Sequence, residues 1–113
     1  MDTHRLSSLL RALADPTRLS IVSLLTRRDF CGCELVPLFG VSQPAVSQHL
    51  ARLKSVGLVN ESRHGQWVFY HLDQDLMAEL SQALSQLRPL SESLSGQLGT
   101  PPANCPWPIA SAR

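Results

Sequence analysis

Two cysteines separated by a single glycine, Cys31-Gly32-Cys33, are the residues of this sequence with the clearest chemical potential. Thiolates bind soft metal ions, and they are also the groups that oxidants attack. The first residues lack the apolar core and the cleavage site of a signal peptide, which predicts a reducing, cytosolic environment. Three cysteines, the third being Cys105, do not form a disulfide framework there. The pair therefore predicts metal binding or redox sensing, and both remain open at this point.

A second group of polar residues lies between positions 42 and 52. At 3.6 residues per turn, a helix here has an apolar face and, about a third of a turn away, a face of small, amide and cationic groups. The apolar face holds Val46, Leu50 and Leu53. The other face holds Ala45, Gln48, His49 and Arg52. Small apolar, amide and guanidinium groups are those that base edges in the DNA major groove accept.

Neighbouring residues fit contacts to the DNA backbone. Hydroxyl and amide groups at the start of this helix, together with its free N–H groups, suit phosphates, and Arg63 and His64 at a predicted hairpin tip suit the backbone or minor groove. The predicted DNA-facing residues are Ser42, Gln43, Pro44, Ala45, Ser47, Gln48, His49, Arg52, Arg63 and His64. The simpler alternative is the solvated face of an amphipathic helix. An aromatic platform for single strands at positions 67–70 is a further alternative, although alternate strand positions favour core and wing packing.

Periodicity and capping residues predict the elements that position these groups. A leucine stripe marks a first helix over 6–13, and Asp15 with Pro16 starts a second helix that ends near 25. A short helix over 32–39 is closed by Gly40, and Ser42 caps a helix that runs to about 56. The period then changes to two, which predicts strands at 58–62 and 67–72 joined by a turn at 63–66. Asp73 caps a last helix that ends or kinks near Pro89.

This order of elements is that of a winged helix-turn-helix, a mainly α fold with a small β-hairpin. A length of 113 residues accommodates one domain. We expect a DNA-binding and dimerisation domain over 1–98 and a flexible Pro-rich tail over 99–113. Because a small domain has a limited core, a second copy is a plausible partner.

Charge and composition narrow the classes of function. The net charge is only +1, but residues 41–72 carry a surplus of two positive charges and residues 73–99 a deficit of three. A basic region beside an acidic one is compatible with an anionic partner at one face. The apolar runs are too short for a transmembrane helix. No catalytic constellation accompanies the serines and histidines, so we do not expect an enzyme.

Four stretches of the sequence together form a specific pattern: Ala12-Leu13-Ala14-Asp15-Pro16-Thr17-Arg18-Leu19, Val41-Ser42-Gln43-Pro44-Ala45-Val46-Ser47-Gln48-His49-Leu50, Gly57-Leu58-Val59 and Arg63-His64-Gly65-Gln66-Trp67-Val68-Phe69-Tyr70. This pattern resembles that of the ArsR/SmtB family of metal-responsive repressors. The resemblance covers roughly residues 5–95. It implies a homodimeric winged helix whose first and last helices pair the subunits. It also implies an apo protein that sits on double-stranded operator DNA and is removed by an inducer ion.

The same resemblance bears on the inducer. Cys31-Gly32-Cys33-Glu34-Leu35 is similar to the Cys-x-Cys element of arsenic-sensing members. Cadmium and lead sensors add cysteines near the N-terminus, and none precedes residue 31 here. Zinc sensors use Asp and His pairs on the final helix, whereas this chain has no histidine after His71. Some arsenic sensors carry a third cysteine at the position of Val36.

The chemistry of the pair favours arsenite, with antimonite as the related candidate, because trivalent arsenic takes three sulfurs in a pyramid. Residues i and i+2 point about 200° apart on a helix, so we expect ligation to distort the helix start, and Gly32 makes this easy. Cys105, on the tail, is predicted to be a third but dispensable ligand.

Three other functions remain in view. The same fold could carry a redox switch in which Cys31 and Cys33 are oxidised, and a peroxide response without an arsenite response would favour it. A cadmium- or lead-responsive member is the second. A small thiol metal-buffering protein without a DNA role is a different class, and operator-independent behaviour would favour it.

Overall fold

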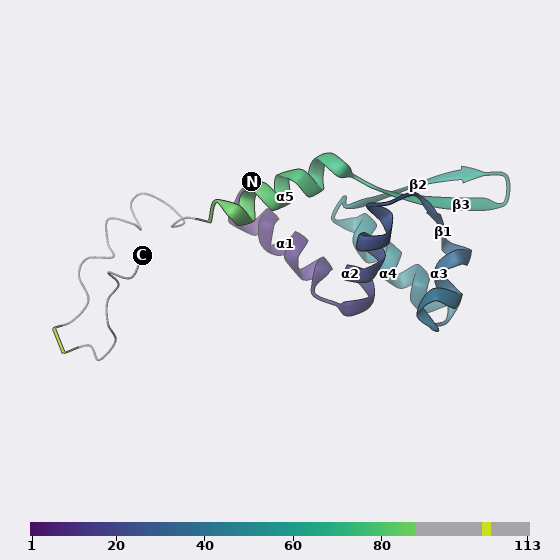
Figure 1. The fold of residues 1–113 in the computed structure, drawn as a ribbon, viewed down its shortest axis with the longest axis horizontal. Coiled ribbons are helices and arrows are strands. Elements are labelled where there is room, and N and C mark those ends of the chain that lie inside the picture. Colours follow the sequence, from purple (N-terminus) through teal and green to yellow (C-terminus); the bar gives the residue numbers. More distant parts are fainter. Residues whose placement is uncertain (88–102, 105–113) are drawn as a thin grey trace.

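The computed structural model describes residues 1–87 and 103–104, and its elements follow the predicted order with one addition (Figure 1). The helices are α1 (Thr3–Leu13), α2 (Pro16–Leu25), α3 (Gly32–Phe39), α4 (Gln43–Ser55) and α5 (Gln74–Ser85). The strands are β1 (Phe30–Cys31), β2 (Val59–His64) and β3 (Trp67–Leu72). The last helix ends at Ser85, four residues before Pro89, near which its end was predicted. The predicted domain boundary at 98 and Cys105 lie outside the described residues.

Several helix starts and stops are set by the residues that the sequence indicated, although α1 begins at Thr3 on the cap Asp2, three residues before its predicted start, and α3 begins on Cys31. Asp15 accepts a hydrogen bond from the Arg18 N–H and Pro16 occupies the first helical position of α2, which confirms the predicted start. Asp73 caps α5 in the same way. Gly40 ends α3 with φ of 62°, a left-handed conformation that glycine adopts without steric cost.

The strands form one antiparallel sheet in the order β1-β3-β2. The predicted hairpin of β2 and β3 is confirmed, although β2 continues to His64 and the turn shortens to Gly65 and Gln66, with φ of 66° at Gly65. Strand β1 was not predicted, because two residues are too few to show an alternating pattern. Its presence corrects the expected hairpin to a three-stranded sheet.

Apolar side chains from every helix and every strand meet in one core. The predicted inner face of α4 is confirmed, since Val46, Leu50 and Leu53 are at most 2% exposed. Side chains from the other elements and from the connection between α4 and β2 complete this core: Leu9, Ala12, Ile21, Val22, Leu25, Phe30, Leu35, Val56, Leu58, Val59, Leu72 and Leu80. The core fixes α3 and α4 against the sheet.

The elements divide between two ends of the molecule (Figure 1). Helices α1 and α5 lie side by side at one end, and the β2–β3 hairpin projects at the other. Helices α3 and α4 pack together nearer to the hairpin. Over residues 1–87 and 103–104, no helix combines the length and the apolar character needed to cross a membrane.

Candidate metal centre and nucleic-acid interface

Helix α4 presents a polar face to solvent. Its cap is Ser42, whose Oγ accepts a hydrogen bond from the Ala45 N–H at 3.2 Å. Most of the predicted DNA-facing residues of this segment are exposed: Ser42, Gln43, Pro44, Ser47, Gln48 and Arg52. Ala45 is half-buried. The structure thus brings together on one surface the amide, hydroxyl and guanidinium groups that can bind base edges and phosphates.

His49 is less exposed than Gln48 and Arg52 on this helix. Its side chain is 22% exposed and its Nδ1 lies 3.7 Å from the Asp15 carboxylate and 3.4 Å from the Arg18 guanidinium. Both partners belong to the start of α2. The His49 ring is therefore directed toward the start of α2, and its contact with DNA stays a prediction.

The hairpin forms the wing, and its tip is polar. Arg63 and His64 are exposed as expected. The His64 ring packs edge-on against Phe69 with 5.7 Å between ring centroids, which orients it. Tyr70 packs against the core, whereas Trp67 is 49% exposed beside the tip. The tip therefore offers one guanidinium, one imidazole and one indole to a partner.

The thiol pair stands at the junction of β1 and α3. Cys31 ends the strand in an extended conformation, and its Sγ accepts a hydrogen bond from the Cys33 N–H at 3.3 Å. Cys31 is thus the N-cap of α3 and precedes the helix, while Cys33 lies in the first turn. The predicted 200° separation does not apply, since only one of the two cysteines has helical geometry.

The two thiols differ in access and in ionisation. Cys31 is buried and Cys33 is exposed. Hydrogen bonding by the Cys31 side chain raises the pKa of the Cys33 thiol, and partial desolvation and the Glu34 carboxylate act in the same direction. Pro37, inside α3, has no N–H to give to the Cys33 carbonyl. The first turn of α3 is therefore held by fewer hydrogen bonds than an ordinary helix start.

Charged side chains around the pair bind one another. The Arg28 guanidinium lies 3.0 Å from the Glu34 carboxylate and 3.7 Å above the Phe30 ring centroid. His71 Nδ1 lies 3.3 Å from Asp29. Within residues 1–87 and 103–104, no group of three His, Cys, Asp or Glu side chains has the spacing of a metal site. The described part of the chain thus offers two sulfurs and no complete ligand set.

Strand β1 attaches the thiol pair to the wing. Cys31 lies opposite Phe69 in the β1–β3 register. The ring of Tyr70 covers Gly32, because a Cβ placed on that glycine would lie 3.4 Å from Tyr70 Cε2. The thiol pair is therefore in direct contact with β3.

A polar connection runs from β3 to the end of α4. Tyr70 lies opposite Glu61 in the β2–β3 register, and the Glu61 carboxylate lies 2.9 Å from Lys54 Nζ. This contact lowers the pKa of Glu61, whereas burial, followed by the charge of Glu61, raises the pKa of Tyr70. Lys54 is in the last turn of α4. Strand β3, which pairs with the thiol-bearing β1, is thus connected through β2 and the Glu61–Lys54 ion pair to the end of α4.

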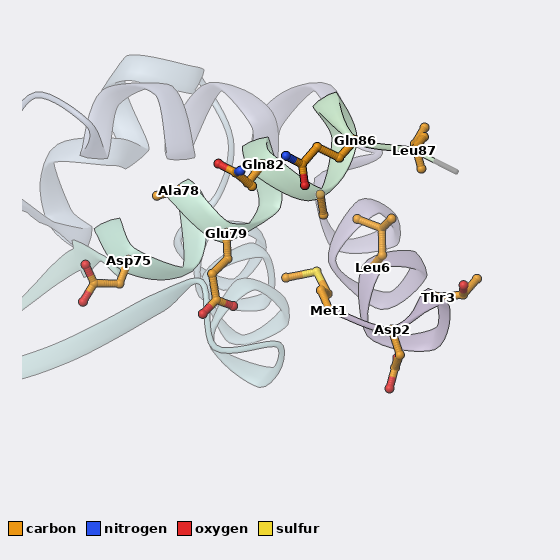
Figure 2. Close-up of a pocket in the computed structure, with 11 residues that line it drawn as sticks. Met1, Asp2, Thr3, Leu6, Asp75, Ala78, Glu79, Gln82, Gln86 and Leu87 are labelled. Atoms are coloured by element: carbon orange, nitrogen blue, oxygen red, sulfur yellow. The ribbon is translucent and has the colours of Figure 1, made fainter. Parts of the chain in front are cut away.

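A groove of about 850 Å³ lies between α1 and α5 (Figure 2). Met1 and Leu6 line it from one side, and Glu79, Gln82 and Leu87 from the other. Large apolar side chains at this end are open to solvent: Leu10 on α1 is 39% exposed, Leu84 on α5 is 40% exposed and Leu87, just after α5, is 69% exposed. This end of the molecule has the character of an interface.

The sequence did not indicate several of these contacts. Arg18 and the Lys54–Glu61 pair join residues of different elements, and no local pattern marks such a pairing. Near Arg18, the sequence showed only the Asp-Pro start of α2, which predicts a helix start but not the partners of the arginine. For Tyr70, the alternation of β3 indicated burial but not the glycine against which the ring packs.

Comparisons with known proteins agree with this geometry. The sequence model of the arsR family of bacterial regulatory proteins matches residues 15–61. The Arsenical resistance operon repressor of Escherichia coli is 38% identical over 79 residues, which are 69% of this chain and 68% of that relative. The Arsenic resistance transcriptional regulator ArsR1 of Pseudomonas putida is 40% identical over 67 residues, or 58% of this chain. The chain spans about half of the latter relative, 52% of its length.

Two further similarities broaden the picture. The HTH-type transcriptional repressor SmtB of Mycobacterium tuberculosis is 46% identical over 72 residues, which cover 64% of this chain and 53% of that relative. A solved structure of reduced HlyU from Vibrio cholerae matches with a TM-score of 0.63 and 34% identity, covering 74% of this chain and 88% of that one. The relatives thus include regulators named for arsenic and regulators that are not.

Proposed function

The chain belongs to the arsR family of bacterial regulatory proteins, and on that premise we propose that it is a repressor that arsenite or antimonite releases from its operator. Its relatives are DNA-binding transcriptional regulators and not enzymes. The observation that carries the inducer proposal is the position of Cys31, which caps the first helix of the helix-turn-helix with a thiol. Because operator DNA lies in the cytoplasm, we expect the protein to act there.

The repressor binds DNA as a homodimer in this proposal. The exposed apolar side chains of α1 and α5 pair two copies, which is typical of the family, and each copy places α4 in a major groove. Equivalent reading helices then lie about one duplex turn, roughly 34–36 Å, apart on a near-palindromic site. Gln48 and Arg52 read base edges from the exposed face, and Arg63 and His64 contact the flanking backbone or minor groove.

The donor set of the thiol pair fits a soft, trivalent ligand. Two sulfurs one residue apart suit arsenic or antimony, which prefer thiolates over carboxylates. On binding, each S–H proton leaves with a hydroxyl of As(OH)₃ as water while a sulfur–arsenic bond replaces the arsenic–oxygen bond. Cys33, being exposed, is the first thiol that a ligand meets, and the buried Cys31 follows.

Cys105 supplies a third sulfur in this proposal, and it is dispensable. It is the one other cysteine of the sequence, and it lies outside the described residues. Ordering a tail costs roughly 1 kcal/mol or more per residue, which limits what the third bond contributes. X-ray absorption without added thiol tests this. We expect three sulfurs around arsenic in the wild type and two in Cys105→Ser, with induction retained at somewhat weaker affinity. An unchanged count and affinity would make Cys105 a bystander.

Release follows from the contacts of Cys31. When its Sγ becomes a ligand, it no longer accepts the Cys33 N–H, and the start of α3 loses its cap. The strain reaches β3 through β1 and reaches α4 through α3, which packs against it. Tyr70, Glu61 and Lys54 extend the same route to the last turn of α4. Both the wing and the reading helix are displaced from their DNA contacts.

Tyr70→Phe tests this route, because it keeps the ring over Gly32 and removes only the hydroxyl beside Glu61. We expect the factor by which arsenite weakens operator binding to fall in this variant, with arsenite affinity for the free protein unchanged. If arsenite weakens operator binding by the same factor in Tyr70→Phe as in the wild type, Tyr70 and Glu61 are not part of the route. The contact between α3 and α4 would then be the only route from the thiol pair to the reading helix.

The proposed function is tested with a duplex from the upstream region of the protein's own gene. The bound duplex is titrated separately with arsenite, antimonite, cadmium and zinc. We expect release by arsenite and antimonite at concentrations at which cadmium and zinc have little effect. Release by cadmium or zinc alone would point to the metal-responsive alternative, for which the similarity to SmtB is the supporting observation.

A redox switch is the second candidate function. The proximity of Cys31 Sγ to the backbone of Cys33 and the similarity to a protein solved as reduced HlyU favour it. In this case peroxide, and not arsenite, releases the operator, and a thiol reductant restores binding. Treatment of the same bound duplex with peroxide separates the two functions.

A further inference from the structure

Arg18, near the start of α2, joins three helices. Its Nε donates a hydrogen bond to the Ala12 carbonyl and its Nη2 lies 3.5 Å from the Arg11 carbonyl, so the guanidinium caps the end of α1. Its Nη1 lies 3.4 Å from Nδ1 of His49 in α4. A half-buried guanidinium that satisfies helix-end carbonyls is held in a fixed place.

The His49 imidazole lies close to one positive and one negative side chain at the start of α2. The Arg18 guanidinium can donate to the neutral imidazole, and the Asp15 carboxylate lies 3.7 Å from the same nitrogen. Asp15 is itself fixed as the cap of α2, where the Arg18 N–H, with a smaller contribution from His49, holds the pKa of its carboxyl below the ordinary value. The imidazole therefore rests between two groups that α2 holds rigidly.

From these contacts we propose that His49 is a positioning residue that fixes the angle of α4 against α1 and α2, and thereby the spacing of the half-sites that the dimer accepts. This inference rests on the proposed dimer, in which α1 belongs to the subunit interface. Because Arg18 connects α4 to α1, the DNA-reading face of α4 is held at a fixed distance from the other subunit. The neighbouring Gln48, which is exposed, reads the bases instead.

Two substitutions at position 49 separate this role from simple packing. His49→Leu keeps the approximate volume and removes the acceptor. His49→Asn keeps an acceptor close to the position of Nδ1, so it should restore the contact with Arg18. Gln48→Ala is the comparison variant for a residue that reads a base. Thermal unfolding of each protein establishes that it is folded before its DNA affinity is measured.

The measurement uses two sets of operator duplexes, one with single base-pair changes and one with the half-sites moved by one base pair in either direction. We expect His49→Leu to bind the natural operator about tenfold more weakly, the equivalent of one hydrogen bond to a charged group. His49→Asn should recover most of that loss. The penalty for altered spacing should shrink in His49→Leu, with base preferences unchanged, whereas Gln48→Ala should lose preference at one base pair.

Each other outcome overturns the inference. If His49→Leu loses discrimination at a single base pair and keeps the full spacing penalty, His49 reads a base. If neither variant at position 49 changes affinity or spacing tolerance, the junction does not position α4. Failure of the wild type to bind a two-half-site duplex as a dimer would instead count against the proposed function, and it would be seen before any variant is compared.

Discussion

The two helices of the helix-turn-helix begin on caps of different chemistry. Helix α4 begins on a hydroxyl, since Ser42 Oγ accepts the Ala45 N–H at 3.2 Å. Helix α3 begins on a thiol, since Cys31 Sγ accepts the Cys33 N–H at 3.3 Å. Serine is a preferred N-cap, whereas a thiol sulfur is a weak acceptor. The start of α3 is therefore held less firmly than the start of α4.

This difference in caps assigns DNA recognition to α4 and the response to the inducer to α3. A soft ion has affinity for the thiol cap and little for the hydroxyl cap, so it acts on α3 and leaves the intrinsic fold of α4 intact. Helix α4 keeps the exposed Gln48 and Arg52 ready for DNA, and α3, packed against it, supplies the movable support. The comparison predicts different consequences for substitutions in the two regions.

The largest effect is expected where the two caps are made alike. Cys31→Ser replaces the thiol with a hydroxyl that suits a helix start but is a poor ligand for arsenic. Operator affinity should stay nearly intact while release by arsenite is lost, and Cys33→Ser should behave in the same way. Fluorescence anisotropy of a labelled operator measures both quantities, and Cys105→Ser is compared as the cysteine variant that should still release DNA, at somewhat higher arsenite concentrations. A Cys31→Ser protein that lets go of DNA at wild-type arsenite concentrations would place the inducer site elsewhere.

A substitution on the reading helix should have the opposite profile. Arg52→Ala is expected to weaken specific binding by about 1–3 kcal/mol if the guanidinium meets a guanine. Arsenite should still release the DNA that remains bound. Competition between operator and non-specific duplex at fixed salt measures the loss. An equal loss on both duplexes would reassign Arg52 to the phosphate backbone.

Removal of the hydroxyl cap has a smaller effect, on folding. Ser42→Ala leaves the Ala45 N–H without its partner and should reduce the free energy of unfolding by about 1 kcal/mol. Ser47→Ala, on the exposed middle of the same helix, is the control and should change stability by about 0.5 kcal/mol or less. Urea denaturation compares the two. Equal stabilities would show that the cap contributes little to α4.

The smallest effect concerns the ion pair that links the wing to α4. Lys54 holds the pKa of Glu61 below its ordinary value. The ion pair therefore stabilises the fold at pH values above the ordinary pKa of glutamate. This stabilisation is lost as the pH falls through the lowered pKa. Glu61→Gln should therefore be less stable than the wild type at neutral pH, by less than about 1 kcal/mol. The difference should shrink as pH falls below the ordinary range in which glutamates titrate. A difference that is constant with pH would mean that the glutamate acts through packing and not through charge.

The sequence alone predicted the features that are local. Asp15 with Pro16, Ser42 and Asp73 mark helix starts through their own backbone contacts, and the apolar spacing of α4 identifies its inner face correctly. The exceptions depend on distant partners. Cys31 lies outside the helix because it pairs with Phe69, which is 38 positions further along the chain. His49 turns inward because Asp15 and Arg18 lie there, and no spacing rule within α4 encodes that.

The most direct test of the central claim, that the thiol cap couples ligand binding to DNA release, measures arsenite affinity with and without the operator. Thermodynamic linkage requires the operator to weaken arsenite binding by the same factor by which arsenite weakens operator binding. Isothermal titration of arsenite into the free dimer and into the operator complex gives that factor. We predict weaker binding to the complex, with the difference absent in Cys31→Ser. Equal arsenite affinities for the free and DNA-bound wild type would contradict the account.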